Sequence, residues 1–264
     1  MNKEYVLITG ATSGIGYELM LLFAKSKNNL LLVSRNKEKL KDIKLNIEKK
    51  YKVNVEYIDI DLSLYDSAEK VFSFITSKKL KISILVNNSG FGWGGEFNSS
   101  SIDRYQDMIN LNILSLTKLT YFILPDMKKR KRGKILNLAS VAAFLPGPYM
   151  SVYFATKAYV LSFSEALFFE NIKYNITVTA LCPGSTKTNF ASVAHLKNQK
   201  SFDSSAMSAK QVALIGYNGL MKGKRVVVTG ILNRLSVFII KFVPHNILGK
   251  IITRINNYWN IIVF

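Results

Sequence analysis

Short, uninterrupted apolar segments recur along this chain, and each is followed by a longer segment with the spacing of a helix. Continuous apolar runs, in contrast to alternating ones, are typical of strands buried on both faces, as in a parallel sheet covered by helices. The repeated strand–helix order therefore predicts an α/β fold with a doubly wound, mostly parallel sheet of the Rossmann type. The expected strands are 5–9, 30–34, 53–58, 82–88, 134–140, 175–181 and 225–230. The expected helices are 14–27, 36–50, 63–78, 101–130 and 151–171.

The chain has 264 residues and shows neither an internal repeat nor a linker, so we expect a single domain over residues 1–230. Within it, residues 185–208 are serine-rich and weakly patterned, which is typical of a lid over a crevice. Residues 231–264 are expected to form a C-terminal helical extension that is basic and amphipathic.

Cysteine and histidine are too scarce to build disulfides or a metal site. The one cysteine, Cys182, excludes an intrachain disulfide, and His195 and His245 are far apart in sequence, so we predict no metal. No apolar run approaches the roughly 18 residues of a membrane span. The start, "MNKEYVLITG", has too short an apolar run for a signal peptide. We therefore expect a cytoplasmic protein.

The formal net charge is +19, which favours an acidic partner such as nucleic acid, an anionic membrane or a phosphorylated ligand. The cations are dispersed and no groove-reading or base-stacking motif accompanies them, so we expect no nucleic-acid partner. The run "KKRKRGK" at 128–134 is either a nucleic-acid patch or the solvated end of a helix. We favour the helix end, because cations suit a helix C-terminus and Gly133 suits its stop.

A glycine-rich turn, "TGATSGIG" at 9–16, joins the first expected strand to the first helix. Its glycines let the backbone turn tightly and approach a pyrophosphate, which the N–H groups of the helix N-terminus then bind. The spacing, G-x-x-x-G-x-G, differs from that of most dinucleotide-binding folds, and such turns also merely connect elements. The residues of this turn that we expect to bind a nucleotide are Gly10, Thr12, Ser13, Gly14, Ile15 and Gly16.

The end of the second strand indicates which dinucleotide binds. An acid there bonds the ribose 2′-hydroxyl of NAD, whereas arginine accommodates the 2′-phosphate of NADP. This chain has Ser34 followed by Arg35 and no acid, so we expect NADP(H) over NAD(H).

A hydroxyl, a phenol and an ammonium group are expected to converge in the same crevice. Ser140 ends the fifth strand, and Tyr153 and Lys157 stand four residues apart in "SVYFATKAYV", so they share one helix face. Their spacing alone also fits a packed tyrosine and a snorkelling lysine. Asn88, Ser89 and Gly90, at the end of the fourth strand, belong to the same crevice edge.

Taken together, these motifs resemble the short-chain dehydrogenase/reductase (SDR) family, in its compact subgroup, from Tyr5 to about Gly230. One departure is Ser89, where the family usually has alanine. The matching elements are TGxxxGxG at 9–16, NNSG at 87–90, Asn112 of "INLN", Ser140, YxxxK at 153–157 and PGxxxT within 182–188. The resemblance implies an NADP(H)-dependent oxidoreductase that interconverts a ketone or aldehyde and an alcohol, working as a homodimer or homotetramer on a small molecule.

The resemblance also implies that Lys157 holds the nicotinamide ribose and that Asn112 holds a water that relays protons. Tyr153 is the expected general acid, and a cation one turn away is expected to lower its ordinary pKa of about 10. Ser140 is expected to hydrogen-bond the carbonyl oxygen of the substrate. The other implied cofactor contacts are Asp61 and Leu62 at the adenine, and Pro183, Gly184 and Thr188 at the carboxamide.

The substrate is less constrained than the chemistry. An apolar pocket wall is expected from Phe144, Leu145, Pro146, Tyr149, Phe190 and Val193. It favours a hydrophobic carbonyl compound: a 3-oxoacyl compound, a steroid-like ketone or a xenobiotic ketone. The alternative is a regulator that senses NADP(H) without turnover, against which the intact Ser140, Tyr153 and Lys157 argue.

The tail after Asp203 has eight cations and no acid. Its amphipathic segments have three open interpretations: they cover the pocket, they form a subunit contact, or they lie on an anionic membrane surface.

Overall fold

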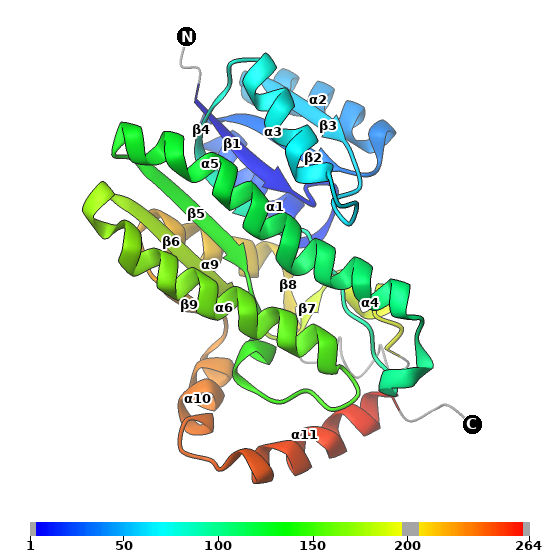
Figure 1. Ribbon diagram of the computed structural model, residues 1–264. Helices are drawn as coiled ribbons and strands as arrows, with labels where there is room; N and C mark the ends of the chain where they lie inside the picture. The colour runs from blue at the N-terminus through cyan, green and yellow to red at the C-terminus, as the bar shows by residue number, and fades with distance from the viewer. Residues whose placement is uncertain (1–3, 197–205, 261–264) are drawn as a thin grey trace.

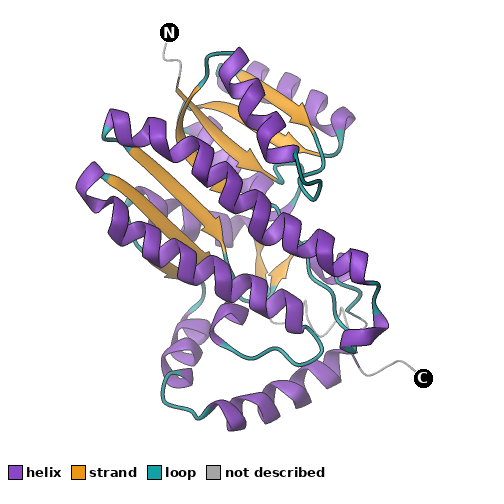
Figure 2. Ribbon diagram, in the orientation of Figure 1, coloured by secondary structure: helices purple, strands orange, loops and turns teal. Residues whose placement is uncertain are grey.

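The computed structural model describes residues 4–196 and 206–260, and its centre is a seven-stranded parallel sheet (Figure 1, Figure 2). The predicted doubly wound α/β fold is confirmed. In spatial order the strands are β3 (Val55–Asp59), β2 (Asn29–Ser34), β1 (Glu4–Thr9), β4 (Lys81–Asn87), β5 (Gly133–Leu138), β6 (Ile176–Cys182) and β9 (Val226–Val228). The chain adds β2 and β3 on one side of β1 and then returns to place β4 on the other. Ligands of such sheets bind beyond the carboxyl ends of the strands at this switch point.

Helices cover both faces of the sheet, and alternate residues of each strand serve the two layers. Val6 and Ile8 of β1 pack in one apolar cluster, whereas Tyr5 and Leu7 pack in the opposite one. The first layer consists of α1 (Gly14–Lys25), α2 (Lys37–Tyr51) and α9 (Ala209–Met221). The second consists of α3 (Ser67–Ser77), α5 (Leu116–Arg130) and α6 (Ser151–Asn171). Burial on both faces explains why the strands read as continuous apolar runs.

Two of the expected helices differ from the observed ones. The helix expected from Ser63 begins at Ser67, because the Asp61 carboxylate accepts hydrogen bonds from the Ser63 N–H and hydroxyl and holds a turn there. The helix expected over 101–130 is α4 (Ile102–Ile109) and α5, joined by a π-helical stretch, Asn110–Ser115. Such stretches are uncommon and often mark functional sites.

A chain of buried amides and hydroxyls crosses the second layer of the fold. Asn87 Nδ2 on β4 donates to Asn137 Oδ1 on β5 at 2.9 Å and to Thr120 Oγ1 on α5 at 3.2 Å. Asn137 Nδ2 donates to Ser164 Oγ on α6 at 2.9 Å. Because a buried polar group is costly when unpaired, these bonds set the register of two helices on two strands.

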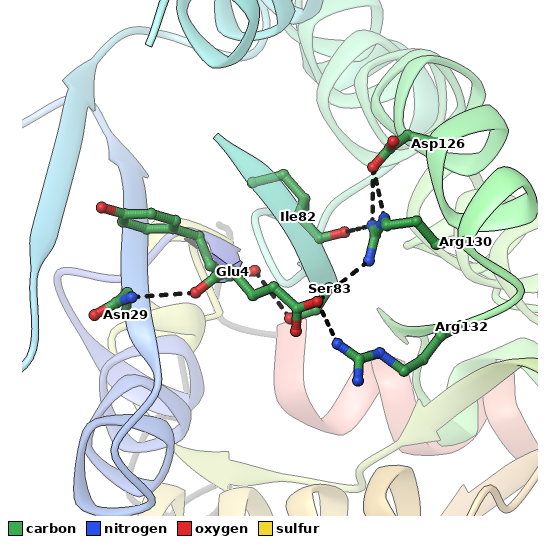
Figure 3. Close-up of polar contacts among 8 residues, drawn as sticks. Glu4, Asn29, Ile82, Ser83, Asp126, Arg130 and Arg132 are labelled. Carbon is green, nitrogen blue, oxygen red and sulfur yellow. Dashed lines mark hydrogen bonds and ion pairs between the residues drawn. The ribbon is translucent and has the colours of Figure 1, made fainter. Parts of the chain in front are cut away.

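The basic run at 128–134 closes the end of the sheet opposite the switch point (Figure 3). Arg130 pairs with Asp126 at 2.9 Å and donates to the Ile82 carbonyl, and both Arg130 and Arg132 pair with Glu4 of β1. The helix stops at Lys131, which adopts the left-handed conformation expected of Gly133. Gly133 is needed for another reason: a Cβ there would lie 2.5 Å from the Met127 sulfur.

The C-terminal extension consists of α10 (Ile231–Ile240) and α11 (His245–Asn260), which lie at one end of the molecule, away from α2 and α3 (Figure 1). The division of the chain at residue 230 stays a prediction. Within the residues described, no helix has both the length and the apolar character to cross a membrane.

We predict that Asn137→Leu lowers the free energy of unfolding by about 2–4 kcal/mol, because it leaves the Asn87 amide and the Ser164 hydroxyl without this partner. Urea unfolding measures the change. Asn46→Ala, at an exposed position of α2, should stay within about 0.5 kcal/mol of wild type. Equal stabilities of the two variants would contradict the structural importance of the buried chain.

Candidate active site

The carboxyl ends of β1 and β4 are locked together at the switch point. Thr9 Oγ1 accepts hydrogen bonds from the backbone N–H groups of Asn88 and Ser89, each at 2.9 Å. Asn88 Nδ2 returns a bond to the Thr9 carbonyl at 2.9 Å. A Cβ on Gly16 would lie 2.4 Å from that same Nδ2, so Gly16 lets α1 approach the lock and does not itself line a cavity.

Two other glycines of this turn adopt backbone conformations that disfavour side chains. Gly10 and Gly14 have φ angles of +67° and +57°. Ser13 precedes α1, and its side chain makes no capping bond, which leaves the first-turn N–H groups of that helix without a side-chain partner. A bare backbone in front of a helix N-terminus can bind a phosphate.

The end of β2 carries the arginine that was predicted to select the cofactor. Thr12 Oγ1 and Ser34 Oγ are hydrogen-bonded at 2.9 Å, and Arg35 Nη1 lies 3.3 Å from Asp61 Oδ2. The Arg35 side chain is 77% exposed. Burial acts to raise the pKa of Asp61, but hydrogen bonds from Ser63 and the Arg35 guanidinium outweigh it and lower that pKa.

Ser140, Tyr153 and Lys157 are buried and lie together, although the first two are 13 positions apart in the sequence. Ser140 follows β5, and its Oγ accepts from the Ala142 N–H at 3.1 Å and donates to the Pro183 carbonyl at 3.4 Å. Lys157, one turn along α6, places Nζ 5.7 Å from the centre of the Tyr153 ring. That Nζ donates to the Leu138 carbonyl at 2.8 Å.

Burial is the main determinant of the pKa values of Tyr153 and Lys157. It raises the pKa of Tyr153 to about 12, against a smaller lowering by the hydrogen bond with Ser140. It lowers the pKa of Lys157 to about 8. The expectation that Lys157 holds the Tyr153 pKa below its ordinary value is therefore wrong for this structure, because desolvation of the phenolate outweighs any attraction to the ammonium group.

Asn112 lies in the π-helical stretch, behind the cavity wall. Its Oδ1 accepts from the Phe91 N–H at 3.1 Å. Its Nδ2 donates to the Phe91 carbonyl at 2.9 Å and to Thr156 Oγ1 at 3.1 Å. The side-chain amide thus ties the loop after β4 to α6, and its expected role in a water relay stays a prediction.

One cavity of about 700 Å³ joins the glycine turn, the end of β2 and the buried Ser140–Tyr153–Lys157 group. Of the expected catalytic and cofactor-binding residues, all but Gly16 and Asn112 line it. The expected residues that do are Gly10, Thr12, Ser13, Gly14, Ile15, Ser34, Arg35, Asp61, Leu62, Asn88, Ser89, Gly90, Ser140, Tyr153, Lys157, Pro183, Gly184 and Thr188.

The cavity continues into an apolar compartment beyond Tyr153. Leu145, Phe190 and Val193 line it as expected, whereas Phe144, Pro146 and Tyr149 do not. Apolar lining residues that the sequence did not single out are Phe91, Met150, Phe154, Leu196, Ile252 and Ile255. The last two belong to α11, so the C-terminal extension covers part of the pocket. Their spacing on an amphipathic helix was the only signal in the sequence.

Arg104 on α4 also lines the cavity and was not predicted. Its guanidinium carbon lies 4.2 Å from the centre of a Trp93 ring, and Nη2 donates to the Val193 carbonyl at 3.0 Å. Val193 ends the short helix α7 (Phe190–Val193), the first part of the expected lid. Arg104 therefore fastens this helix over the cavity. Residues 197–205 of that lid lie outside the described residues.

Comparison with known proteins agrees with the fold and the motifs. The family model for short chain dehydrogenases matches residues 4–199, and the chain belongs to this family of oxidoreductases. Very-long-chain 3-oxoacyl-CoA reductase of Rattus norvegicus is 35% identical over 196 residues, covering 72% of this chain and 62% of that protein. Hydroxysteroid dehydrogenase-like protein 1 of Gallus gallus is 34% identical, covering 75% of this chain and 60% of that protein. The chain thus spans about three fifths of the length of these curated relatives.

Solved structures extend the similarity over nearly the whole chain. A short-chain dehydrogenase from Sphingobium yanoikuyae, in complex with NADPH, is 29% identical with a TM-score of 0.81, covering 89% of this chain and 92% of that one. A bulky-bulky ketone specific alcohol dehydrogenase from Comamonas testosteroni is 25% identical with a TM-score of 0.75, covering 91% and 94%. The fold and the family are therefore shared with enzymes whose structures are known.

We predict that the contribution of the buried Lys157 to stability rises between about pH 8 and pH 10. With a folded pKa of about 8 against an ordinary 10.5, the unfolded chain binds a proton in this window that the folded chain does not. Relative to Lys157→Met, the wild type should gain about 2–3 kcal/mol of unfolding free energy over these two pH units. Urea unfolding at several pH values measures this. Lys49→Met, at an exposed position, should retain the wild-type slope, and a Lys157→Met profile parallel to wild type would contradict the prediction.

Proposed function

We propose that this protein is an NADP(H)-dependent oxidoreductase that interconverts a hydrophobic ketone or aldehyde and the corresponding alcohol. The observation that carries the proposal is the continuity of one cavity. It runs from the glycine turn and Arg35, past the buried Ser140–Tyr153–Lys157 group, to an apolar compartment under α7 and α11.

The residues at the turn and at the end of β2 fit a nicotinamide dinucleotide with a 2′-phosphate. Gly14 lines the cavity and has no side chain to fill it. A Cβ at this position would lie 3.0 Å from the Thr188 methyl group. The exposed guanidinium of Arg35 suits a phosphate, and Ser34 offers a hydroxyl where a carboxylate would repel one. Asp61 accepts a hydrogen bond from Arg35 Nη1, and the other N–H donors of the guanidinium can bind a ligand.

The chemistry of the chain's own residues follows from their burial. A bound nicotinamide supplies or accepts the hydride. Tyr153, with a pKa of about 12, holds its proton near neutral pH and so has one to donate to the oxygen of a carbonyl being reduced. Ser140 lies next to the phenol, so its hydroxyl can hydrogen-bond that oxygen as well. Lys157, with a pKa of about 8, is mostly charged near pH 7 and places this charge 5.7 Å from the centre of the Tyr153 ring.

A 3-oxoacyl thioester is the substrate class that we put first, ahead of steroid-like and xenobiotic ketones. Two findings support it. The compartment beyond Tyr153 is lined by apolar side chains from α6, α7 and α11, which suits an acyl chain. Relatives that are 32–35% identical are named very-long-chain 3-oxoacyl-CoA reductases.

We predict that Tyr153→Phe retains NADPH binding but lowers the turnover number by a factor of about 10² or more, because the ring stays while the proton donor is lost. Fluorescence titration with NADPH measures binding. NADPH oxidation with 3-oxoacyl thioesters, hydrophobic ketones and aldehydes measures turnover. Near wild-type turnover in the variant would refute the role of Tyr153. Tight NADPH binding by the wild type with no activity on any carbonyl would instead favour a sensor.

We predict that Arg35→Ala lowers kcat/KM for NADPH by about 10- to 100-fold and leaves that for NADH within about twofold. The loss is that of a charge-assisted bond to the 2′-phosphate. Steady-state kinetics with both cofactors measure it. Lys39→Ala, on the exposed side of α2, is the matched control and should change neither value. An equal loss with both cofactors would mean that Arg35 does not read the 2′-phosphate.

A further inference from the structure

The outer face of α10 and of the turn that follows it is apolar and highly exposed. Ile231, Leu232 and Phe242 are 82%, 78% and 74% exposed, although each carries a large apolar side chain. We call the C-terminal apolar face the set Ile231, Leu232, Leu235, Phe238, Ile239 and Phe242, all of which are exposed. The Phe238 and Phe242 rings are in contact, with centres 5.3 Å apart. Exposed apolar clusters of this kind mark interaction sites.

The tail that forms this face contains cations and no acid. Lys241, Lys250 and Arg254 are exposed on and beside α10 and α11. No acidic residue follows Asp203 anywhere in the sequence, and the segment 141–150, part of which packs on α10, carries no charge. Among the neighbouring basic groups, Arg225 is already paired with Glu165 of α6 at 3.0 Å.

This charge distribution decides between two occupants of the face. A second copy of the chain, packed symmetrically, would bring these cations against their own counterparts with no carboxylate of the tail to pair with them. An anionic bilayer supplies both an apolar layer for the aromatic side chains and phosphates at the level of the lysines. We propose that the α10–α11 region docks on the surface of an anionic membrane through the C-terminal apolar face.

The position of α11 connects this docking face with the active-site cavity. Ile247, Ile251 and Ile255 of α11 are exposed, and Ile252 and Ile255 line the cavity. Figure 1 shows α10 and α11 together at the end of the molecule beyond the carboxyl ends of the strands. Docking would therefore bring the apolar compartment next to lipid. This consequence rests on the proposed function, but the docking itself is independent of it.

Co-sedimentation of the full chain with phosphatidylcholine vesicles, with and without phosphatidylglycerol, tests the proposal at low and high salt. We expect binding to the anionic vesicles at low salt and weaker binding at high salt. Phe238→Ser/Phe242→Ser should weaken binding about tenfold or more, and Lys241→Glu/Lys250→Glu by a similar factor. Leu45→Ser/Ile102→Ser and Lys49→Glu/Lys129→Glu are matched controls elsewhere on the surface and should bind like wild type.

Circular dichroism and NADPH titration should show that all variants remain folded and bind the cofactor, so loss of docking is distinguishable from failure of the proposed function. Absence of binding to anionic vesicles at low salt would overturn the proposal. Undiminished binding of both docking-face variants would do the same. Sedimentation velocity without lipid gives a third decisive result: an oligomer of the wild type that dissociates in Phe238→Ser/Phe242→Ser would make the face a subunit contact.

Discussion

The lock between β1 and β4 is the contact on which the rest of the site depends. Thr9 and Asn88 bond each other's backbone through their side chains, so the two central strands end at a fixed separation. Gly16 brings α1 against this lock, and the positive φ of Gly10 turns the chain around it. The helix N-terminus, the glycine turn and the loop after β4 thereby acquire one geometry, which opens the crevice at the switch point of the sheet.

The same burial that shapes this crevice sets the pKa values of Tyr153 and Lys157. Ser140, Tyr153 and Lys157 are taken out of water by the helices and loops that close the cavity. In that environment both charged forms are disfavoured, so the phenol keeps its proton and the ammonium group releases its own more readily. A protonated tyrosine beside a moderately basic lysine is suited to giving a proton to a carbonyl oxygen, which is the direction that reduction requires.

Much of the fold could be predicted from the sequence, because its signals are local. Apolar strands, the turn at 9–16 and the spacing of Tyr153 and Lys157 each depend on a few consecutive residues. What could not be predicted depends on contacts between distant segments. Three features become visible only in the tertiary structure: the π-helical stretch around Asn112, the hydrogen bond from Arg104 to the Val193 carbonyl of α7, and the contribution of Ile252 to the cavity wall. The pKa of Tyr153 was misjudged for the same reason, since spacing shows a neighbouring charge but does not show burial.

The C-terminal extension shows most clearly that a sequence pattern does not reveal contacts between distant segments. An amphipathic pattern says that a helix has an apolar side, but not what covers it. In α11, Ile252 and Ile255 line the cavity and Ile251 does not, although Ile251 and Ile255 are both exposed. In α10, Val237 is the one fully buried residue. A helix that contributes so little to the core, in a tail with cations and no acids, is better explained by an external partner than by the stability of the fold.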